Sequence, residues 1–192
     1  MVFPGPIEVI AGGMFAGKTG ELILRLTRAE LARQTTAAFK HALDVRYAPD
    51  NLATHVAPRP SGRSTEHPAV PVSTPSAILS FLDRSALPSV VGIDEAQFFD
   101  NTLPDVCRQL SVWGVRVIVA GLDMDSEGAP FGSMGTMLAI ADKVTKVHAV
   151  CMICGANATH TLYHGGAKQD QVLVGAHEYS ARCRICWYTN RQ

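Results

Sequence analysis

Short apolar runs alternate with amphipathic stretches along the first three quarters of this 192-residue chain. The runs have the length and apolar content of buried strands and lie at residues 7–11, 89–94 and 115–121. Amphipathic spacing, helped by a proline in the first turn of the third segment, predicts helices over residues 21–33, 76–84, 104–113 and 135–142. Strands that alternate with helices in this way indicate an α/β fold with a mostly parallel sheet.

The stretch between the first helix and the second strong strand is less regular. Residues 37–40 form a thin apolar segment that predicts a further strand. Residues 48–75 are rich in proline, which predicts a loop or an irregular excursion. In the helix before them, we expect Leu22, Leu26, Ala29 and Leu31 to share one face.

A glycine-rich stretch joins the first strand to the first helix. It fits the pattern G-x-x-x-x-G-K-[S/T] and consists of Gly12, Gly13, Met14, Phe15, Ala16, Gly17, Lys18 and Thr19. A strand before it and a helix after it are the context that a phosphate-binding loop needs, which argues against a chance glycine turn. We expect backbone N–H groups and Lys18 to hold nucleotide phosphates, and Thr19 to ligate Mg²⁺.

A pair of acids follows the second strong strand. Asp94 comes at the end of an apolar run, where a Walker B aspartate holds Mg²⁺, and Glu95 beside it can accept a proton. We place Gln97, from the same short motif, near the bound cofactor. The pattern alone leaves a kinase and an ATPase open. It also occurs in helicases, but those need two motor domains and a basic track that this chain lacks.

Four cysteines frame the C-terminal part of the chain. They form two C-x-x-C pairs, Cys151 with Cys154 and Cys183 with Cys186, separated by 28 residues. Two such pairs suit tetrahedral zinc and leave no open position for catalysis, so we expect a structural Zn²⁺. A redox pair is the weaker alternative. The fifth cysteine, Cys107, lies in a predicted helix and is expected to be a core residue.

Composition limits the remaining functions. The formal net charge is zero, so the chain has no electrostatic footprint for nucleic acid. It also has no apolar run of membrane-spanning length and no secretory signal, and we therefore expect a cytoplasmic protein. The length suits one core with a small appendage. We expect a phosphate-loop domain over residues 1–143 and a zinc-binding subdomain over residues 144–192.

Taken together, the motifs resemble those of the type II thymidine kinases, the cytosolic and bacterial enzymes with a zinc-tethered lasso. The likeness runs from Val9 to Tyr188. It implies transfer of a phosphoryl group from ATP, with Mg²⁺, to the 5′-hydroxyl of thymidine in nucleoside salvage for DNA synthesis. It also implies that Glu95 is the general base, that Asp44 and Arg46 lie near the phosphates, and that the protein is a homotetramer.

The resemblance further implies a set of nucleoside-binding positions: Met14, Phe98, Leu122, Ser126, Phe131, Thr161, Tyr163, Val172, Val174 and Tyr179. Two of them depart from the family. Ser126 replaces a phenylalanine that stacks on thymine, and Tyr163 occupies an arginine position, in a lasso that is shorter than usual. A different or modified nucleoside is therefore the first alternative acceptor. An ATPase whose zinc tail binds a macromolecule is the second alternative.

Overall fold

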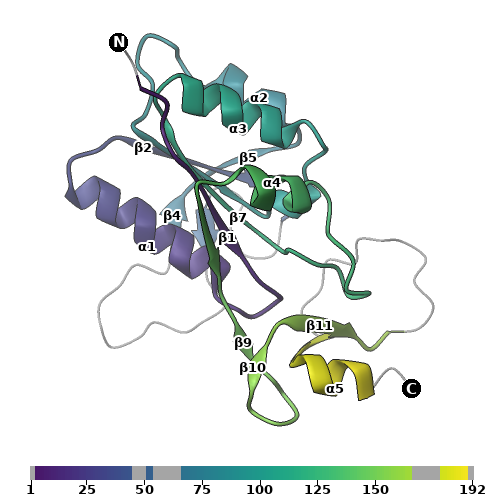
Figure 1. Cartoon of the computed structure of the whole chain (residues 1–192). Helices are drawn as coiled ribbons and strands as arrows, with labels where there is room; N and C mark the ends of the chain where they lie inside the picture. Colours follow the sequence, from purple (N-terminus) through teal and green to yellow (C-terminus); the bar gives the residue numbers. More distant parts are fainter. Residues whose placement is uncertain (1–2, 45–50, 54–65, 166–177, 190–192) are drawn as a thin grey trace.

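Six parallel strands form the central sheet of the computed structural model, which describes residues 3–44, 51–53, 66–165 and 178–189. Their order across the sheet is β5-β2-β6-β7-β1-β8 (Figure 1). The strands are β1 (Ile7–Ala11), β2 (Thr36–His41), β5 (Val70–Val72), β6 (Val90–Asp94), β7 (Arg116–Gly121) and β8 (Lys143–Lys146). The predicted α/β class is confirmed.

Helices cover both faces of the sheet, as a parallel sheet requires. They are α1 (Lys18–Leu31), α2 (Pro75–Phe81), the 3₁₀ helix η1 (Ala96–Phe98), α3 (Leu103–Val112) and α4 (Met134–Ile140). Alternation along β1 shows the two layers: Val9 packs in the core beneath α2, α3 and α4, whereas Ile10 packs against Leu22 and Leu26 of α1. In Figure 1, α1 lies on one side of the sheet, and α2, α3 and α4 lie on the opposite side.

Two expectations about this part of the chain are wrong. Leu31 is 80% exposed and does not share the buried face of α1 with Leu22, Leu26 and Ala29. With 3.6 residues per turn, position 31 lies on the side of the helix opposite Leu22. The proline-rich segment is also more regular than expected. Its described residues include β5 and the antiparallel pair β3 (Asn51–Ala53) and β4 (Glu66–Pro68). Pro71 is tolerated within β5 because that strand is at the sheet edge.

The sheet continues past the domain boundary that the sequence predicts. Strand β8 starts at Lys143 and pairs with β1 from Glu8 to Ala11. A smaller C-terminal unit follows beyond one end of the sheet (Figure 1). Its elements are β9 (Ala149–Val150), β10 (Asn157–Ala158), β11 (His160–Tyr163), β12 (Tyr179–Arg182) and α5 (Arg184–Thr189). The division into two domains stays a prediction, and β8 belongs with the sheet.

A buried ion cluster ties α1 to the strands beneath it. Glu8 on β1 is 7% exposed, and its two carboxylate oxygens lie 2.7 Å from Arg25 Nη1 and 2.7 Å from Arg116 Nε. Burial alone would raise the pKa of Glu8. The hydrogen bonds and charges of Arg116 and Arg25 outweigh burial and lower that pKa. Glu8 thus stabilises the fold as a carboxylate.

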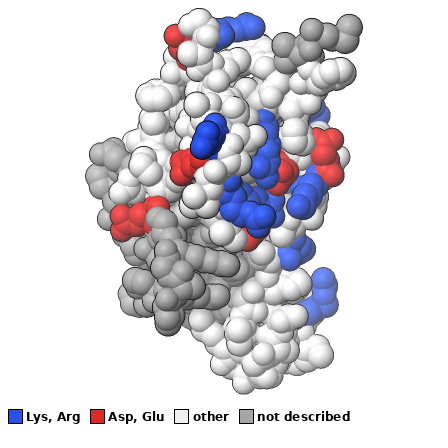
Figure 2. Space-filling view, turned by 90° about the vertical axis from the view of Figure 1, so that its left-hand side faces the viewer, with Lys and Arg blue, Asp and Glu red and all other residues white. Residues whose placement is uncertain are grey.

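The surface does not show a continuous basic track on the face drawn in Figure 2. Lys and Arg side chains gather near the middle of that face, with Asp and Glu side chains beside them. A pocket of about 420 Å³ between α1 and the strands is also lined by charges of both signs, because Glu8 and Glu21 lie there beside arginines. Of the described helices, none is long and apolar enough to cross a membrane.

Replacing Glu8 with glutamine tests the ion cluster. At neutral pH we expect Glu8→Gln to lower the free energy of unfolding by about 2–3 kcal/mol, because Arg25 and Arg116 both lose the Glu8 charge. The loss is moderated because Arg25 keeps Glu21 at 2.9 Å and Arg116 keeps some water. The folded-state pKa of Glu8 is lowered. Its contribution to stability is therefore fully present at pH values above the usual pKa of glutamate, and it is lost as the pH falls through the pKa of the folded state. Urea unfolding at neutral and acidic pH measures both effects.

Asp105→Asn is the matched control, because the Asp105–Arg108 pair is exposed on both sides. This variant should change stability by less than about 0.5 kcal/mol. Equal effects of the two substitutions would contradict a buried, stabilising Glu8.

Candidate functional site

The loop between β1 and α1 has the shape of an anion cradle. Gly17 caps α1 with φ +83°, and Phe15 also has a left-handed backbone, with φ +64°. Such turns direct successive N–H groups to one side. Gly12 is held by a second constraint, since a Cβ there would lie 2.3 Å from the carbonyl oxygen of Val147. The loop is therefore packed directly against the chain that follows β8.

The residues at the start of α1 face the end of β6. Lys18 Nζ donates to the Gly13 carbonyl at 2.8 Å, which keeps the ammonium against the loop. Thr19 Oγ1 donates to Asp94 Oδ2 at 2.8 Å. The two residues that sequence spacing predicts as magnesium ligands are thus in direct contact.

Asp94 is almost completely buried, with 3% exposure. Burial, followed by the negative charge of Glu95, raises the pKa of Asp94 to about 7, while the Thr19 hydroxyl acts in the opposite direction. Burial and the neighbouring negative charge destabilise the ionised form of Asp94, and a cation bound nearby would stabilise it. Because carboxylate and hydroxyl oxygens are hard ligands, the pair fits Mg²⁺ and could hold it.

Glu95 turns the chain out of β6 in a conformation that is uncommon for a residue with a side chain. Its φ is +52°, and the turn continues into η1. The Glu95 carboxylate accepts a hydrogen bond from Gln97 Nε2 at 2.5 Å, and Gln97 Oε1 accepts one from the backbone N–H of Leu122 at 2.9 Å. The acid pair is therefore linked to the loop that follows β7.

Aromatic residues lie beside this acid pair. Phe98 on η1 meets Phe131 edge to face, with ring centroids 5.9 Å apart. His41, at the end of β2, packs against Phe98 and Phe99, at centroid distances of 6.0 and 4.7 Å. His41 could not be predicted from the sequence, because only the pairing of β2 with β6 brings it here.

The C-terminal unit reaches the phosphate loop. Thr161 on β11 accepts a hydrogen bond from the Met14 N–H at 3.1 Å, and Ala16 packs against the small apolar core of the unit. Trp187 on α5 donates to the Thr161 carbonyl at 3.3 Å. A Cβ at Gly128 would lie 3.0 Å from the Trp187 ring, so this ring also covers the loop after β7. Trp187 was not among the predicted residues, since its only signal in the sequence is its place beside Cys186.

The remaining predicted acceptor residues have mixed placements. Tyr163 and Tyr179 face each other across β11 and β12, with centroids 5.1 Å apart. Ser126 is buried at 7% exposure in the loop after β7. In the same loop Asp123, which was not predicted, lies 2.7 Å from Lys146 Nζ at the end of β8. Asp44 follows β2 in a turn.

Three predicted residues lie outside the described part of the chain: Arg46, Val172 and Val174.

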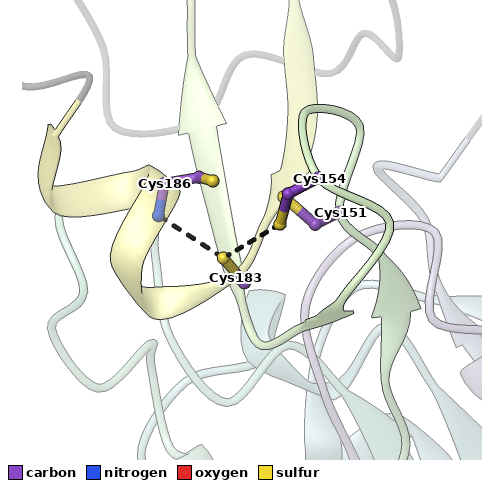
Figure 3. A group of neighbouring side chains, drawn as sticks. All are labelled: Cys151, Cys154, Cys183 and Cys186. Carbon is purple, nitrogen blue, oxygen red and sulfur yellow. Dashed lines mark hydrogen bonds between the residues drawn. The ribbon is translucent and has the colours of Figure 1, made fainter.

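The four framing cysteines converge (Figure 3). Their sulfur atoms all lie within 4.8 Å of one another, and Cys154 Sγ is 3.6 Å from Cys183 Sγ. Tetrahedral zinc with bonds of about 2.3 Å needs sulfurs about 3.8 Å apart, so the group could hold one zinc ion. Cys107 lies elsewhere, fully buried in the main core, and burial raises the pKa of its thiol to about 12.

Comparison with known proteins gives a consistent result. The family model described as "Thymidine kinase" matches residues 5–187. The thymidine kinase of Bacteroides thetaiotaomicron is 48% identical over 189 residues, which are 97% of this chain and 89% of that protein. The thymidine kinase of Coprothermobacter proteolyticus is 49% identical over 187 residues, which are 94% and 89% of the two chains. With the phosphate loop, acid pair and cysteine group in place, the chain belongs to the thymidine kinase family and is a nucleoside kinase.

Proposed function

We propose that this kinase transfers the γ-phosphoryl group of ATP, with Mg²⁺, to the 5′-hydroxyl of thymidine or a close pyrimidine nucleoside. The observation that carries the proposal is the 2.8 Å hydrogen bond between Thr19 and Asp94, with Glu95 as the next residue. This contact joins a phosphate cradle, two hard oxygen ligands and a proton acceptor at one edge of the sheet. The names of the relatives support thymidine as the acceptor.

Phosphate binding, metal binding and proton transfer are assigned to different residues of the site. Loop N–H groups and Lys18 would hold the outer phosphates, and Thr19 and Asp94 would hold the metal. Bound Mg²⁺ supplies positive charge that offsets the charge developing on the transferring group. Glu95 accepts the proton of the 5′-hydroxyl as that oxygen bonds to the γ-phosphorus. The bond from this phosphorus to the bridging oxygen breaks, and ADP leaves.

The acceptor would lie against the aromatic residues beside Glu95. The contact between Phe98 and Phe131, together with Leu122 on the neighbouring loop, supports an apolar wall for a base. Met14 and Thr161 support closure by the C-terminal unit, because their hydrogen bond joins it to the phosphate loop. Keeping water away from the γ-phosphate is what such a cover does for a kinase.

Ser126 favours a second candidate within the same chemistry. A hydroxyl cannot replace the stacking face of a phenylalanine, a contact worth roughly 1–3 kcal/mol per base. A different or modified nucleoside is therefore the alternative acceptor. The family assignment argues against the third reading, an ATPase with a macromolecule-binding tail.

We further infer that zinc is structural and that the protein is a cytoplasmic homotetramer. Four thiolates leave no open coordination position, which supports a structural ion. The tetramer and the compartment are supported by the family resemblance alone.

Lys18 and Glu95 should fail in different ways. Lys18→Ala removes a charge from the phosphate loop, so both ATP binding and turnover should fall. Glu95→Gln keeps the size of the side chain but removes the base. Turnover should then drop by about 10²–10⁴-fold while ATP affinity stays near that of the wild type. Steady-state kinetics with thymidine, and ATP titration by calorimetry, separate the two. A nearly fully active Glu95→Gln enzyme would show that the base is assigned incorrectly.

Metal analysis tests the cysteine group. We expect about one Zn²⁺ per chain, and Cys→Ser at any of the four positions should reduce metal content and loosen the C-terminal unit before the sheet. Hydrogen exchange locates the loosening. Cys107→Ser is the control and should keep its zinc, because that thiol lies in the main core. A preparation free of zinc with a fully protected C-terminal unit would exclude a structural metal.

Ser126→Phe distinguishes the two acceptors. For thymidine we expect kcat/KM to rise about 10–100-fold, because the ring restores a stacking face. If the natural acceptor is larger, the same substitution should block that acceptor while it improves thymidine. Kinetics with a nucleoside panel measure both. Melting temperatures must accompany them, since Ser126 is buried. Unchanged kinetics in a stable variant would place Ser126 outside the pocket.

A further inference from the structure

Gln97 is a buried polar side chain between two strand ends. It is 2% exposed and lies on η1, directly after the turn that leaves β6. Its carboxamide has a partner at each end: Nε2 lies 2.5 Å from Glu95 Oε2, and Oε1 lies 2.9 Å from the Leu122 backbone nitrogen. One amide therefore spans the space between the acid pair and the loop after β7.

The direction of these two hydrogen bonds is determined by the Leu122 N–H. A backbone N–H can only donate, so the amide group that faces it must be the oxygen of Gln97. The NH₂ group is then turned toward Glu95, whose carboxylate must accept. This arrangement fixes which Glu95 oxygen receives the bond, namely Oε2.

The surrounding chain approaches Gln97 closely at both its backbone and its side chain. A Cβ at Gly132 would lie 2.3 Å from the backbone carbonyl oxygen of Gln97, so only glycine permits this close approach. A Cβ at Gly121 would lie 3.0 Å from Gln97 Oε1 and 2.7 Å from Met134 Sδ. The backbone at Glu95 is also constrained, because its left-handed turn is closed by a hydrogen bond from the Phe98 N–H to the Glu95 carbonyl at 3.1 Å.

We propose that Gln97 is a positioning residue for the reaction, which holds the Glu95 carboxylate at one orientation and anchors it to the end of β7. The inference rests on the proposed function, in which Glu95 is the general base. It assigns Gln97 a role different from the cofactor contact that the sequence motif predicts. Because the amide oxygen and one N–H are used within the protein, Gln97 acts on the reaction through Glu95.

The experiment is a double-mutant cycle between Gln97 and Glu95. Gln97→Met keeps the side-chain length and removes both hydrogen bonds. We expect kcat to fall about 10–100-fold, as for a misplaced catalytic group, with the nucleoside KM and the affinity for Mg²⁺-ATP within about threefold of wild type. In the Glu95→Gln background the same substitution should cost less than about threefold, because the group that it orients no longer works. Gln109→Met, at an exposed position of α3, is the control and should leave kcat unchanged.

A second variant changes the charge of the side chain and keeps its size. Gln97→Glu keeps the size and the acceptor for the Leu122 N–H but presents a carboxylate to Glu95. We expect it to lower kcat at least as much as Gln97→Met, because a second carboxylate repels the group that Gln97 orients. Circular dichroism measures the melting temperature of each variant.

Several results would overturn the proposal. Equal losses of kcat in the wild-type and Glu95→Gln backgrounds would indicate a purely structural residue. A loss of Mg²⁺-ATP affinity in Gln97→Met would indicate that Gln97 contacts the cofactor, as the sequence motif predicts. An unchanged kcat in folded variants would show that Gln97 has no role in the reaction. Failure of the proposed base is seen separately, because Glu95→Gln alone would then keep its activity.

Discussion

Parallel pairing of β1, β7 and β6 is the constraint on which the functional part of the molecule depends. Because all three strands run in the same direction, their carboxyl ends meet at one edge of the sheet. The register makes this alignment close, since Ala11 at the end of β1 lies opposite Gly121 at the end of β7. The phosphate loop, the acid pair and the loop that begins at Leu122 are the three segments that leave these ends. Their proximity is thus a property of the strands.

The C-terminal unit completes this edge from outside the sheet. It contacts the phosphate loop through Thr161 and Ala16, and it contacts the loop after β7 through Trp187. The cysteine group brings the two ends of the unit together, with one pair after β9 and the other after β12. Order in this small unit, which has few core residues, therefore affects two of the three segments that form the candidate site.

Much of the fold could be predicted from the sequence, because a strand buried on both faces is a continuous apolar run and a phosphate loop has fixed spacing. Strand β8 could not, since its four residues lie at a solvated edge and include two lysines. In the site, spacing located Asp94 and Glu95. It could not show that Gln97 joins Glu95 to Leu122, or that Lys146 meets Asp123, because such contacts arise only from the tertiary fold.

The two outermost strands of the sheet bear on how copies of this protein can associate. An uncovered strand edge offers N–H and C=O groups to any other chain, and it is a common origin of aggregation. Here β8 has lysines at both of its ends, and β5 has Pro71 at its middle residue, which removes one donor. Charge and a missing N–H are two devices that make such an edge a poor template. Continuous pairing of one central sheet with another is therefore disfavoured at either side, which favours self-association through surfaces other than these two edges.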